Sequence, residues 1–218
     1  MITRRELARR IDHTLLRAYA TQVDITELCD EAAANGFAAV AVNGAWVTYC
    51  AKRLAGSGVG VAATIGFPLG AATAHVKLEE AREALKNGAT ELDMVINIGA
   101  LKSGYPQFVE KEIAALVKAA GAAPVKVILE TCYLNRDEKI DVCQMAGRAG
   151  VAFVKTSTGY GDDGATVEDV LLMREVVGTA CGVKAAGGIR TYAEAVALID
   201  GGADRIGTSS GVEILASC

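Results

Sequence analysis

The sequence predicts an α/β fold, a single-domain (β/α)8 TIM barrel that spans residues 1–218. At four places a helix-like segment ends at a glycine and a short apolar run follows, at Gly36, Gly88, Gly150 and Gly202. Eight βα units in this chain would take about 27 residues each, so successive junctions lie about two βα units apart. Aromatic residues make up only 5% of the chain, so small aliphatic residues must form the core, as parallel strands require.

Strands and helices are expected to alternate along the whole chain. Eight short apolar runs are expected as strands, at residues 11–16, 37–42, 59–65, 89–96, 125–130, 151–155, 183–186 and 203–207. Segments of helical pattern separate them, at residues 25–35, 47–54, 75–87, 108–120, 137–148, 166–177 and 192–200. Thr191 and Glu194 form a capping-box pattern at the start of the last helix. No linker or low-complexity tract divides the chain, so one domain is expected.

Composition argues against several classes of partner. The net charge of −4 argues against nucleic-acid binding, which needs a basic face. No apolar run reaches the roughly 18–20 residues of a membrane span, so no membrane partner is expected. Arg4, Arg5 and Glu6 lead into no apolar signal segment, and we expect a cytoplasmic location.

The cysteines and histidines do not form a metal-binding pattern. The six cysteines contain no C-x-x-C pair and are expected to be reduced, mostly buried thiols. The two histidines, His13 and His75, stand apart from any cluster of metal-ligand residues. We therefore expect neither a metal nor a cofactor. His13 is expected in a hydrogen-bonded position on the helix-facing side of its strand, and Asp204 and Arg205 are expected to form a structural ion pair.

Charged residues interrupt strands that should be almost entirely apolar. They are Asp12, Asp93, Lys126, Glu130, Lys155 and Lys184. The three lysines are equally spaced, with 29 residues from each to the next, so their ammonium groups are expected to face one another inside the barrel. An internal salt-bridge network without chemistry would explain some of these charges, because an isolated buried charge is costly. Several charges at matching depth favour a functional site.

Clustered lysines suit amine chemistry. An ordinary lysine is only about 0.04% neutral at pH 7, whereas burial beside a second ammonium lowers its pKa. The neutral amine can then attack a carbonyl and form a Schiff base. Asp93 is the nearest candidate to move protons during those steps.

Three loops rich in Gly, Ser and Thr follow the last three strands. They are residues 156–159, 186–190 and 207–211. Loops of this kind at the carboxyl ends of the last barrel strands often hold a phosphate through backbone N–H groups. Ordinary turn chemistry is the alternative, because glycine and serine are common in any loop.

On these motifs the chain resembles the 2-deoxyribose-5-phosphate aldolase family. The matching segments are residues 11–16, 66–70, 91–97, 126–131, 153–159, 183–190 and 205–210, which cover almost the whole chain. The most specific is 153–159, which resembles the segment around the family's Schiff-base lysine.

The resemblance implies a class I aldolase that reversibly splits 2-deoxy-D-ribose 5-phosphate into D-glyceraldehyde 3-phosphate and acetaldehyde, a step of deoxyribonucleotide catabolism. It implies that Lys155 is the Schiff-base nucleophile, Lys184 the cation that lowers its pKa, and Asp93 the proton donor and acceptor. Further residues are implied in phosphate binding (Gly159, Gly187, Gly188, Ser209 and Ser210) and in support of the site (Asp12, Thr14 and Lys126). The expected partners are a sugar phosphate and aldehydes, and both a homodimer and a homotetramer stay open.

Two departures from the family and two alternatives remain. Ala41 to Gly44 stand where members often carry Cys and Pro, and the chain ends at Cys218 without the C-terminal tyrosine of longer members. Proton transfer is then expected to depend on Asp93, Lys184 and water. One alternative is a different class I aldolase, with its lysine on another strand. The other is a non-catalytic barrel that binds sugar phosphates, whose lysines would have ordinary pKa values.

Overall fold

Eight parallel strands close into a barrel in chain order, with β8 paired back to β1. The structure is a computed structural model that describes residues 2–218, so Met1, which the expected domain includes, lies outside the described residues. The strands are β1 (Ile11–Leu15), β2 (Ala39–Val42), β3 (Gly60–Ile65), β4 (Glu91–Val95), β5 (Val125–Ile128), β6 (Phe153–Lys155), β7 (Gly182–Ala186) and β8 (Arg205–Thr208). The predicted (β/α)8 barrel is confirmed.

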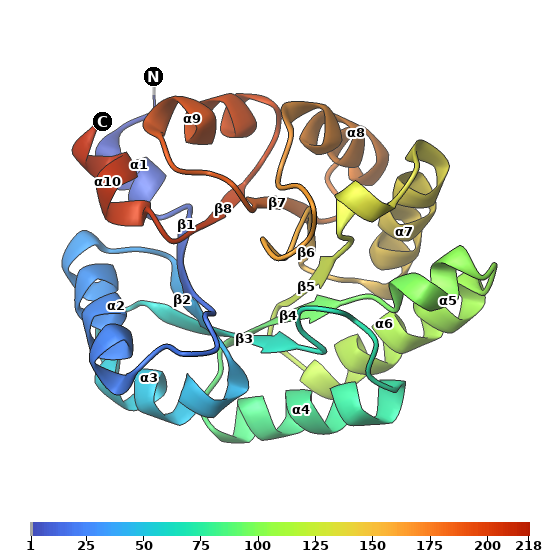
Figure 1. The fold of residues 1–218 in the computed structure, drawn as a ribbon, viewed down its shortest axis with the longest axis horizontal. Coiled ribbons are helices and arrows are strands. Elements are labelled where there is room, and N and C mark those ends of the chain that lie inside the picture. Colours follow the sequence, from blue (N-terminus) through green and yellow to red (C-terminus); the bar gives the residue numbers. More distant parts are fainter. Residues whose placement is uncertain (1) are drawn as a thin grey trace.

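Helices surround the barrel on all sides (Figure 1). They are α1 (Arg4–Ala8), α2 (Gln22–Asn35), α3 (Val47–Arg53), α4 (Ala74–Lys86), α5 (Ile98–Lys102), α6 (Pro106–Ala120), α7 (Arg136–Ala149), α8 (Val167–Val177), α9 (Tyr192–Asp200) and α10 (Gly211–Ala216). Two short 3₁₀ turns, Gly44–Trp46 and Thr131–Tyr133, follow β2 and β5. Within residues 2–218 no helix has the length and apolar character needed to cross a membrane.

Local sequence explains where the helices begin and end. Gly36 and Gly150 follow α2 and α7 with φ of 63° and 77°, the left-handed conformation that glycine adopts without a steric penalty. The Thr191 side chain accepts from Glu194 N–H while the Glu194 carboxylate accepts from Thr191 N–H, which confirms the capping box of α9. The short helices α1, α5 and α10 were not predicted, because five or six residues are too few for a helical period to stand out.

Strand β5 is shorter than predicted. It ends at Ile128, whereas the apolar run predicted a strand as far as Glu130. Glu130 has a φ of 57° and a ψ of 68°, a left-handed conformation that cannot continue a strand. The acid therefore belongs to the loop after β5 and not to the barrel wall.

The strand register places the three lysines at two depths. Lys155 lies directly opposite Lys184, but Lys126 lies opposite Phe153, two residues before Lys155. Equal spacing along the chain therefore does not give equal depth, because neighbouring barrel strands are staggered. Because the strands tilt, residues paired in register differ in height by about one residue per strand, and alternate strands fill each layer. Lys126 and Lys184 therefore share a layer, and the expectation of one common depth is wrong for Lys155, which lies one layer closer to the carboxyl ends of the strands.

Outside the barrel, the apolar layer between strands and helices contains one buried ion pair. Lys77 on α4 is fully buried, and its Nζ lies 2.9 Å from Glu112 Oε1 on α6. Lys77 Nζ also donates to Val95 O at 2.8 Å, and Glu112 Oε2 accepts from Asn97 N–H at 3.2 Å. The pair thus fastens two helices to the carboxyl end of β4.

The predicted ion pair between Asp204 and Arg205 is wrong. Neighbouring residues on a strand point to opposite faces, so these two side chains diverge. Asp204 pairs with Arg174 on α8, whereas Arg205 Nη1 lies 2.6 Å from Asp12 Oδ1 inside the barrel. His13 lies in the hydrogen-bonded, helix-facing position expected for it, because its ring Nε2 lies 2.7 Å from Glu31 Oε2 on α2.

Removing either partner of the Lys77–Glu112 pair is expected to destabilise the protein. Lys77→Met or Glu112→Leu leaves an unpaired charge in an apolar layer, and the free energy of unfolding should fall by about 3–5 kcal/mol. The double variant Lys77→Met/Glu112→Leu should recover most of that loss, because no charge is left buried. Urea unfolding followed by circular dichroism measures both effects. A single variant within about 0.5 kcal/mol of wild type would contradict this account.

Candidate active site

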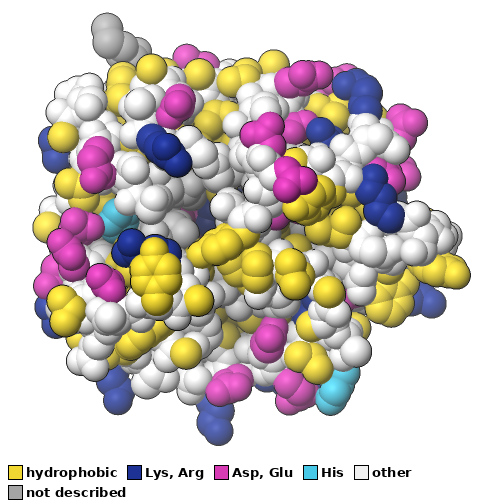
Figure 2. Space-filling model, viewed as in Figure 1, with side chains coloured by type: hydrophobic (Ala, Val, Ile, Leu, Met, Phe, Trp, Pro, Cys, Tyr) yellow, Lys and Arg dark blue, Asp and Glu magenta, His cyan; other side chains and the backbone are white. Residues whose placement is uncertain are grey.

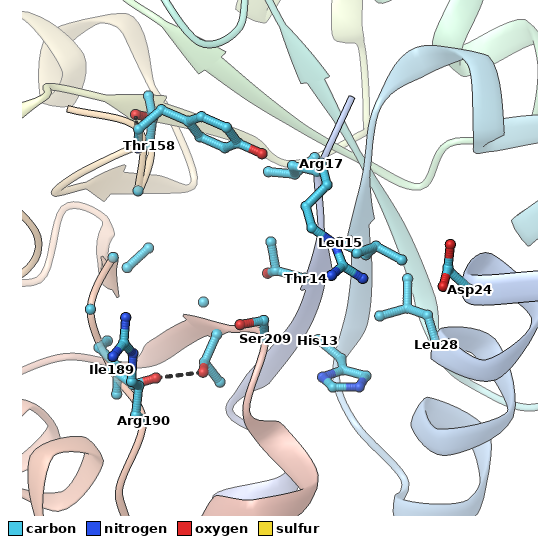
Figure 3. Close-up of a pocket in the computed structure, with 18 of the residues that line it drawn as sticks. His13, Thr14, Leu15, Arg17, Asp24, Leu28, Thr158, Ile189, Arg190 and Ser209 are labelled. Atoms are coloured by element: carbon cyan, nitrogen blue, oxygen red, sulfur yellow. Dashed lines mark hydrogen bonds between the residues drawn. The ribbon is translucent and has the colours of Figure 1, made fainter. Parts of the chain in front are cut away.

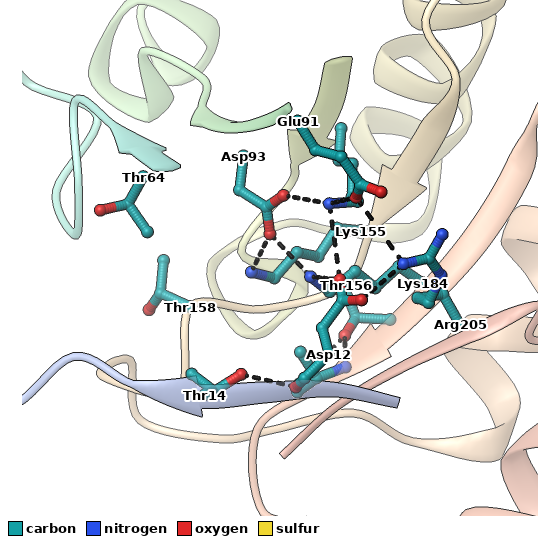
Figure 4. A network of polar contacts seen from close by, with 12 residues as sticks. Asp12, Thr14, Thr64, Glu91, Asp93, Lys155, Thr156, Thr158, Lys184 and Arg205 are labelled. Carbon is teal, nitrogen blue, oxygen red and sulfur yellow. Dashed lines mark hydrogen bonds and ion pairs between the residues drawn. The ribbon is translucent and has the colours of Figure 1, made fainter. Parts of the chain in front are cut away.

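The Asp93 carboxylate lies inside the barrel among the ammonium groups of three lysines. Its Oδ1 accepts from Lys126 Nζ at 2.7 Å, and its Oδ2 accepts from both Lys155 Nζ and Lys184 Nζ at 2.8 Å. All four side chains are buried. Figure 4 shows Lys155 and Lys184 directed at this carboxylate. The expectation that the three ammonium groups meet inside the barrel is confirmed.

Two more acids and an arginine complete the charged network. Asp12 on β1 pairs with Lys184 and, at 2.6 Å, with Arg205. Glu91 Oε2, two residues before Asp93 on the same face of β4, lies 2.5 Å from Lys126 Nζ. Neither Glu91 nor Arg205 was predicted as a member of the site. The alternation of β4 could have revealed Glu91, because residues two apart on a strand share a face.

The pKa of Lys155 is lowered from its ordinary value to about 8. Burial is the main cause, since it disfavours the charged amine, and the neighbouring Lys184 ammonium adds to it. The Asp93 carboxylate opposes this shift but does not cancel it. With a pKa of about 8, about a tenth of the Lys155 side chains carry a neutral amine at pH 7.

Asp93 and Lys126 shift in the opposite sense, toward their charged forms. Burial alone would raise the pKa of Asp93, but the three ammonium groups hold it well below its ordinary value. Burial alone would lower the pKa of Lys126, but the carboxylates of Asp93, Asp12 and Glu91 raise it above its ordinary value. Lys126 therefore stays protonated and cannot act as a nucleophile, whereas Lys155 can.

A pocket of about 510 Å³ gives access to the network at Lys155. Among residues 2–218, Lys155 is the only lysine that lines this pocket; Lys126, Lys184 and Asp93 are fully buried behind it. Thr14 also lines the pocket, and its hydroxyl donates to Asp12 O at 2.9 Å. Lys155 is thus the one amine of the network that a bound molecule can reach.

The glycine-rich loops after β6, β7 and β8 form part of the pocket wall. Gly159, Gly187, Gly188 and Ser209 line it, and their role in phosphate binding stays a prediction. A Cβ at Gly164 would lie 2.3 Å from Gly187 O, so only a residue without a side chain lets the loops after β6 and β7 meet backbone to backbone.

Ser210 stands outside this pocket wall. It lies at the start of α10, and its N–H donates to Thr208 Oγ1 at 2.9 Å. Its predicted role in phosphate binding stays a prediction.

Several residues at the pocket were not predicted. Arg17 and Arg190 line it from different sides and bring two positive charges (Figure 3). Thr158 and Tyr160, next to the predicted Gly159, also line it. Arg190, Thr158 and Tyr160 stand within or beside predicted motifs, but a single sequence does not show which side chains of a loop turn inward.

The face seen in Figure 2 is hollowed, with hydrophobic side chains at the edge of the hollow. The loops after β1, β3 and β6 carry the exposed Tyr19, Leu69 and Tyr160. Phe67 packs edge to face on Tyr160, with ring centroids 5.5 Å apart. For metal ions, residues 2–218 contain no group of three or more His, Cys, Asp or Glu side chains placed to hold one.

Comparison with known proteins assigns the family. A model of the DeoC/LacD family aldolases matches residues 7–217. The chain belongs to this family. It is 58% identical to a deoxyribose-phosphate aldolase of Thermococcus gammatolerans over 214 residues, 96% of this chain and 95% of that protein. It is 55% identical to one of Streptococcus pneumoniae, with 96% of both chains covered.

Solved structures agree with this assignment. A deoxyribose phosphate aldolase of Aeropyrum pernix, described as a tetramer, superposes with a TM-score of 0.92 and 38% identity, over 99% of this chain and 92% of that one. The predicted resemblance is confirmed, and the chain is an aldolase, a carbon–carbon lyase.

The charge balance around Lys155 can be tested by titration. Lys184→Met removes the neighbouring ammonium, so the pKa of Lys155 should rise above 8 by roughly one pH unit. The rate at which an amine-specific reagent modifies Lys155, followed by peptide mass spectrometry across pH 6–11, reports that pKa. Lys102→Met, a change at an exposed lysine paired with Glu138, is the control and should leave it unchanged. A pKa of Lys155 that stays at 8 in Lys184→Met would contradict the coupling.

Proposed function

We propose that the chain cleaves 2-deoxy-D-ribose 5-phosphate reversibly to D-glyceraldehyde 3-phosphate and acetaldehyde, through a Schiff base on Lys155. The observation that carries this proposal is that Lys155, with a pKa of about 8, is the only lysine of residues 2–218 that lines the pocket. The names of the relatives support the substrate, since each is called a deoxyribose-phosphate aldolase.

The reaction begins at the aldehyde carbon of the open-chain sugar. The neutral amine of Lys155 attacks C1, a proton moves to the oxygen, and loss of water leaves a protonated imine. The C2–C3 bond then breaks: its electron pair moves into the imine to give an enamine, and the C3 hydroxyl loses its proton as C3 becomes the aldehyde carbon of glyceraldehyde 3-phosphate. Protonation of the enamine at C2 and addition of water release acetaldehyde and restore the amine.

Buried groups are available to move these protons. Asp93 and Lys184 both contact the network around the Lys155 amine, with Lys184 Nζ and Lys155 Nζ on the same Asp93 oxygen. We assign them the proton transfers at the carbinolamine and imine. Lys126 and Asp12, held in their ion pairs, keep Asp93 and Lys184 in place.

The loops after β6, β7 and β8 suit the phosphate. Backbone N–H groups of Gly159, Gly187, Gly188 and the Ser209–Ser210 turn are proposed to bind it, as the loops after the last barrel strands commonly do. Arg190 lines the same wall and adds a charge-assisted contact.

Assembly and location complete the proposal. The tetrameric relative from Aeropyrum pernix supports a homo-oligomer, a dimer or a tetramer. All six cysteines are free thiols, which suits the reducing cytoplasm, where deoxyribonucleotide catabolism would take place.

The Schiff base can be trapped. Acetaldehyde with borohydride at pH 7 should attach an ethyl group to Lys155, because its amine is partly neutral while exposed lysines are protonated. Peptide mass spectrometry locates the group. Lys155→Leu should lose both the adduct and all aldolase activity, whereas Lys102→Leu should keep both. Wild-type protein without an adduct at Lys155 would favour a non-catalytic binding barrel.

Arg190 is expected to contribute to phosphate recognition. Arg190→Leu should raise KM for 2-deoxyribose 5-phosphate by roughly tenfold, the loss of one charge-assisted contact, with little change in kcat. Steady-state kinetics with 2-deoxyribose, which has no phosphate, provide the control. An equal effect on the sugar without phosphate would place the Arg190 contact elsewhere.

A further inference from the structure

Glu130 is a buried acid behind the pocket wall, in contact with the pocket residue Thr158, and the proposed reaction steps leave it without a role. It lies in the loop after β5, and its side chain is 2% exposed. With a φ of 57°, it is the only non-glycine residue among residues 2–218 in the left-handed region. A side chain in that conformation costs free energy, so the surrounding structure must hold Glu130 there.

Within residues 2–218, Thr158 is the residue that donates hydrogen bonds to the Glu130 carboxylate. The carboxylate accepts from Thr158 N–H at 3.2 and 3.3 Å, one distance to each oxygen, and Oε2 also accepts from the Thr158 hydroxyl. Gly161 makes room for the acid, because a Cβ there would lie 3.0 Å from Glu130 Cδ. The loop after β6 is therefore built around this carboxylate.

These contacts fix the polarity of the Thr158 hydroxyl. A threonine hydroxyl has one proton to donate and two lone pairs that accept. Its proton is donated to Glu130, and one lone pair accepts from Tyr160 N–H at 3.0 Å. The lone pair that remains can only accept a hydrogen bond. Thr158 lines the pocket, so the partner it suits is a donor on a bound molecule.

The position of Thr158 indicates which part of the molecule that donor occupies. The loop runs from Lys155, the proposed attachment point of the sugar, through Thr158 to Gly159, a proposed phosphate ligand. In the substrate, hydroxyl-bearing carbons lie between the aldehyde and the phosphate. An acceptor group at Thr158 therefore faces the hydroxyls of the middle of the sugar.

We propose that Glu130 is a positioning residue that holds the Thr158 hydroxyl as an acceptor, and that this arrangement selects aldehydes with a hydroxyl on the carbon next to the carbonyl. The inference rests on the proposed aldolase reaction, in which such an aldehyde is the product of cleavage and the acceptor of synthesis. The selected class is 2-hydroxyaldehydes over plain alkyl aldehydes.

Glu130→Gln tests the polarity with almost no change of shape. The amide oxygen can still accept from Thr158 N–H, which places the amide N–H₂ against the Thr158 hydroxyl. The hydroxyl oxygen then accepts from both the amide and Tyr160 N–H, and its proton turns into the pocket. Thr158 becomes a donor, and a hydroxyl of the aldehyde loses its acceptor.

The readout is a ratio of two reactions with acetaldehyde as the common partner. D-glyceraldehyde carries the 2-hydroxyl and propanal lacks it, and kcat/KM for each as acceptor is measured by product chromatography. We expect Glu130→Gln to lower the preference for glyceraldehyde over propanal about tenfold, the effect of one hydrogen bond, with the propanal reaction within about twofold of wild type. Thr158→Val should give the same loss, and the double variant no further loss.

The matched control is Glu112→Gln, a change at a buried carboxylate that also accepts a backbone N–H but lies among the outer helices. It should leave the preference unchanged. If kcat/KM fell equally for both acceptors in Glu130→Gln and Thr158→Val, Glu130 would only hold the loop. If the preference for glyceraldehyde stayed unchanged, Thr158 would contact no hydroxyl of the aldehyde. Either result overturns the inference. Should Glu130→Gln fail to fold, Thr158→Val decides it alone. Wild-type protein that adds acetaldehyde to neither acceptor would overturn the proposed function itself, and this inference with it.

Discussion

The site depends on an imbalance of charge inside a dry barrel. The network holds four cationic side chains, Lys126, Lys155, Lys184 and Arg205, and three carboxylates, Asp12, Glu91 and Asp93. Charges buried in such a medium must be paired, and here one cation exceeds the number of anions. The excess is removed when one lysine becomes neutral. Among residues 2–218, Lys155 makes an ion pair with Asp93 only, whereas Lys126 faces three carboxylates. Lys155 is therefore the amine that gives up its proton most easily.

The stagger of the strands decides which lysine the substrate can reach. Lys155 is the last residue of β6, at the carboxyl end where the loops open into the pocket, and Lys126 lies one layer deeper. Lys184 pairs with Lys155 in the register yet is fully buried behind it, so its reach is limited to the Lys155 amine and the atoms bonded to that amine. Three lysines of the same spacing thus divide into one amine at the pocket, Lys155, and two fully buried amines behind it.

Much of this arrangement could be predicted from the sequence, and the remainder could not for physical reasons. Charges such as Asp93 and Lys155 are conspicuous because a strand packed on both sides is otherwise apolar. Arg205 was wrongly predicted to pair with its chain neighbour Asp204. Charged residues are common at strand ends, so nothing in the sequence marked Arg205 as a residue of the barrel interior. Lys77 and Glu112 were missed since charges on a helix usually face solvent, and their burial depends on how α4 packs on α6. Glu130 was placed in a strand because an apolar run gives no sign of a left-handed residue at its end.

Glu130 is a fourth acid near the Lys155 amine, but it does not form an ion pair that would keep this amine protonated. Burial raises the pKa of Glu130 above its ordinary value, and the hydrogen bonds from Thr158 and the positive charge of Lys155 oppose that rise. A direct ion pair would stabilise the ammonium form of Lys155 and remove the neutral amine that the proposed chemistry needs. Within residues 2–218 the only carboxylate that pairs with Lys155 is Asp93, because both oxygens of Glu130 are held by Thr158. The left-handed backbone at Glu130 directs the acid to the loop and away from the lysine, so one strained residue both orders the pocket wall and preserves the charge imbalance on which the amine depends.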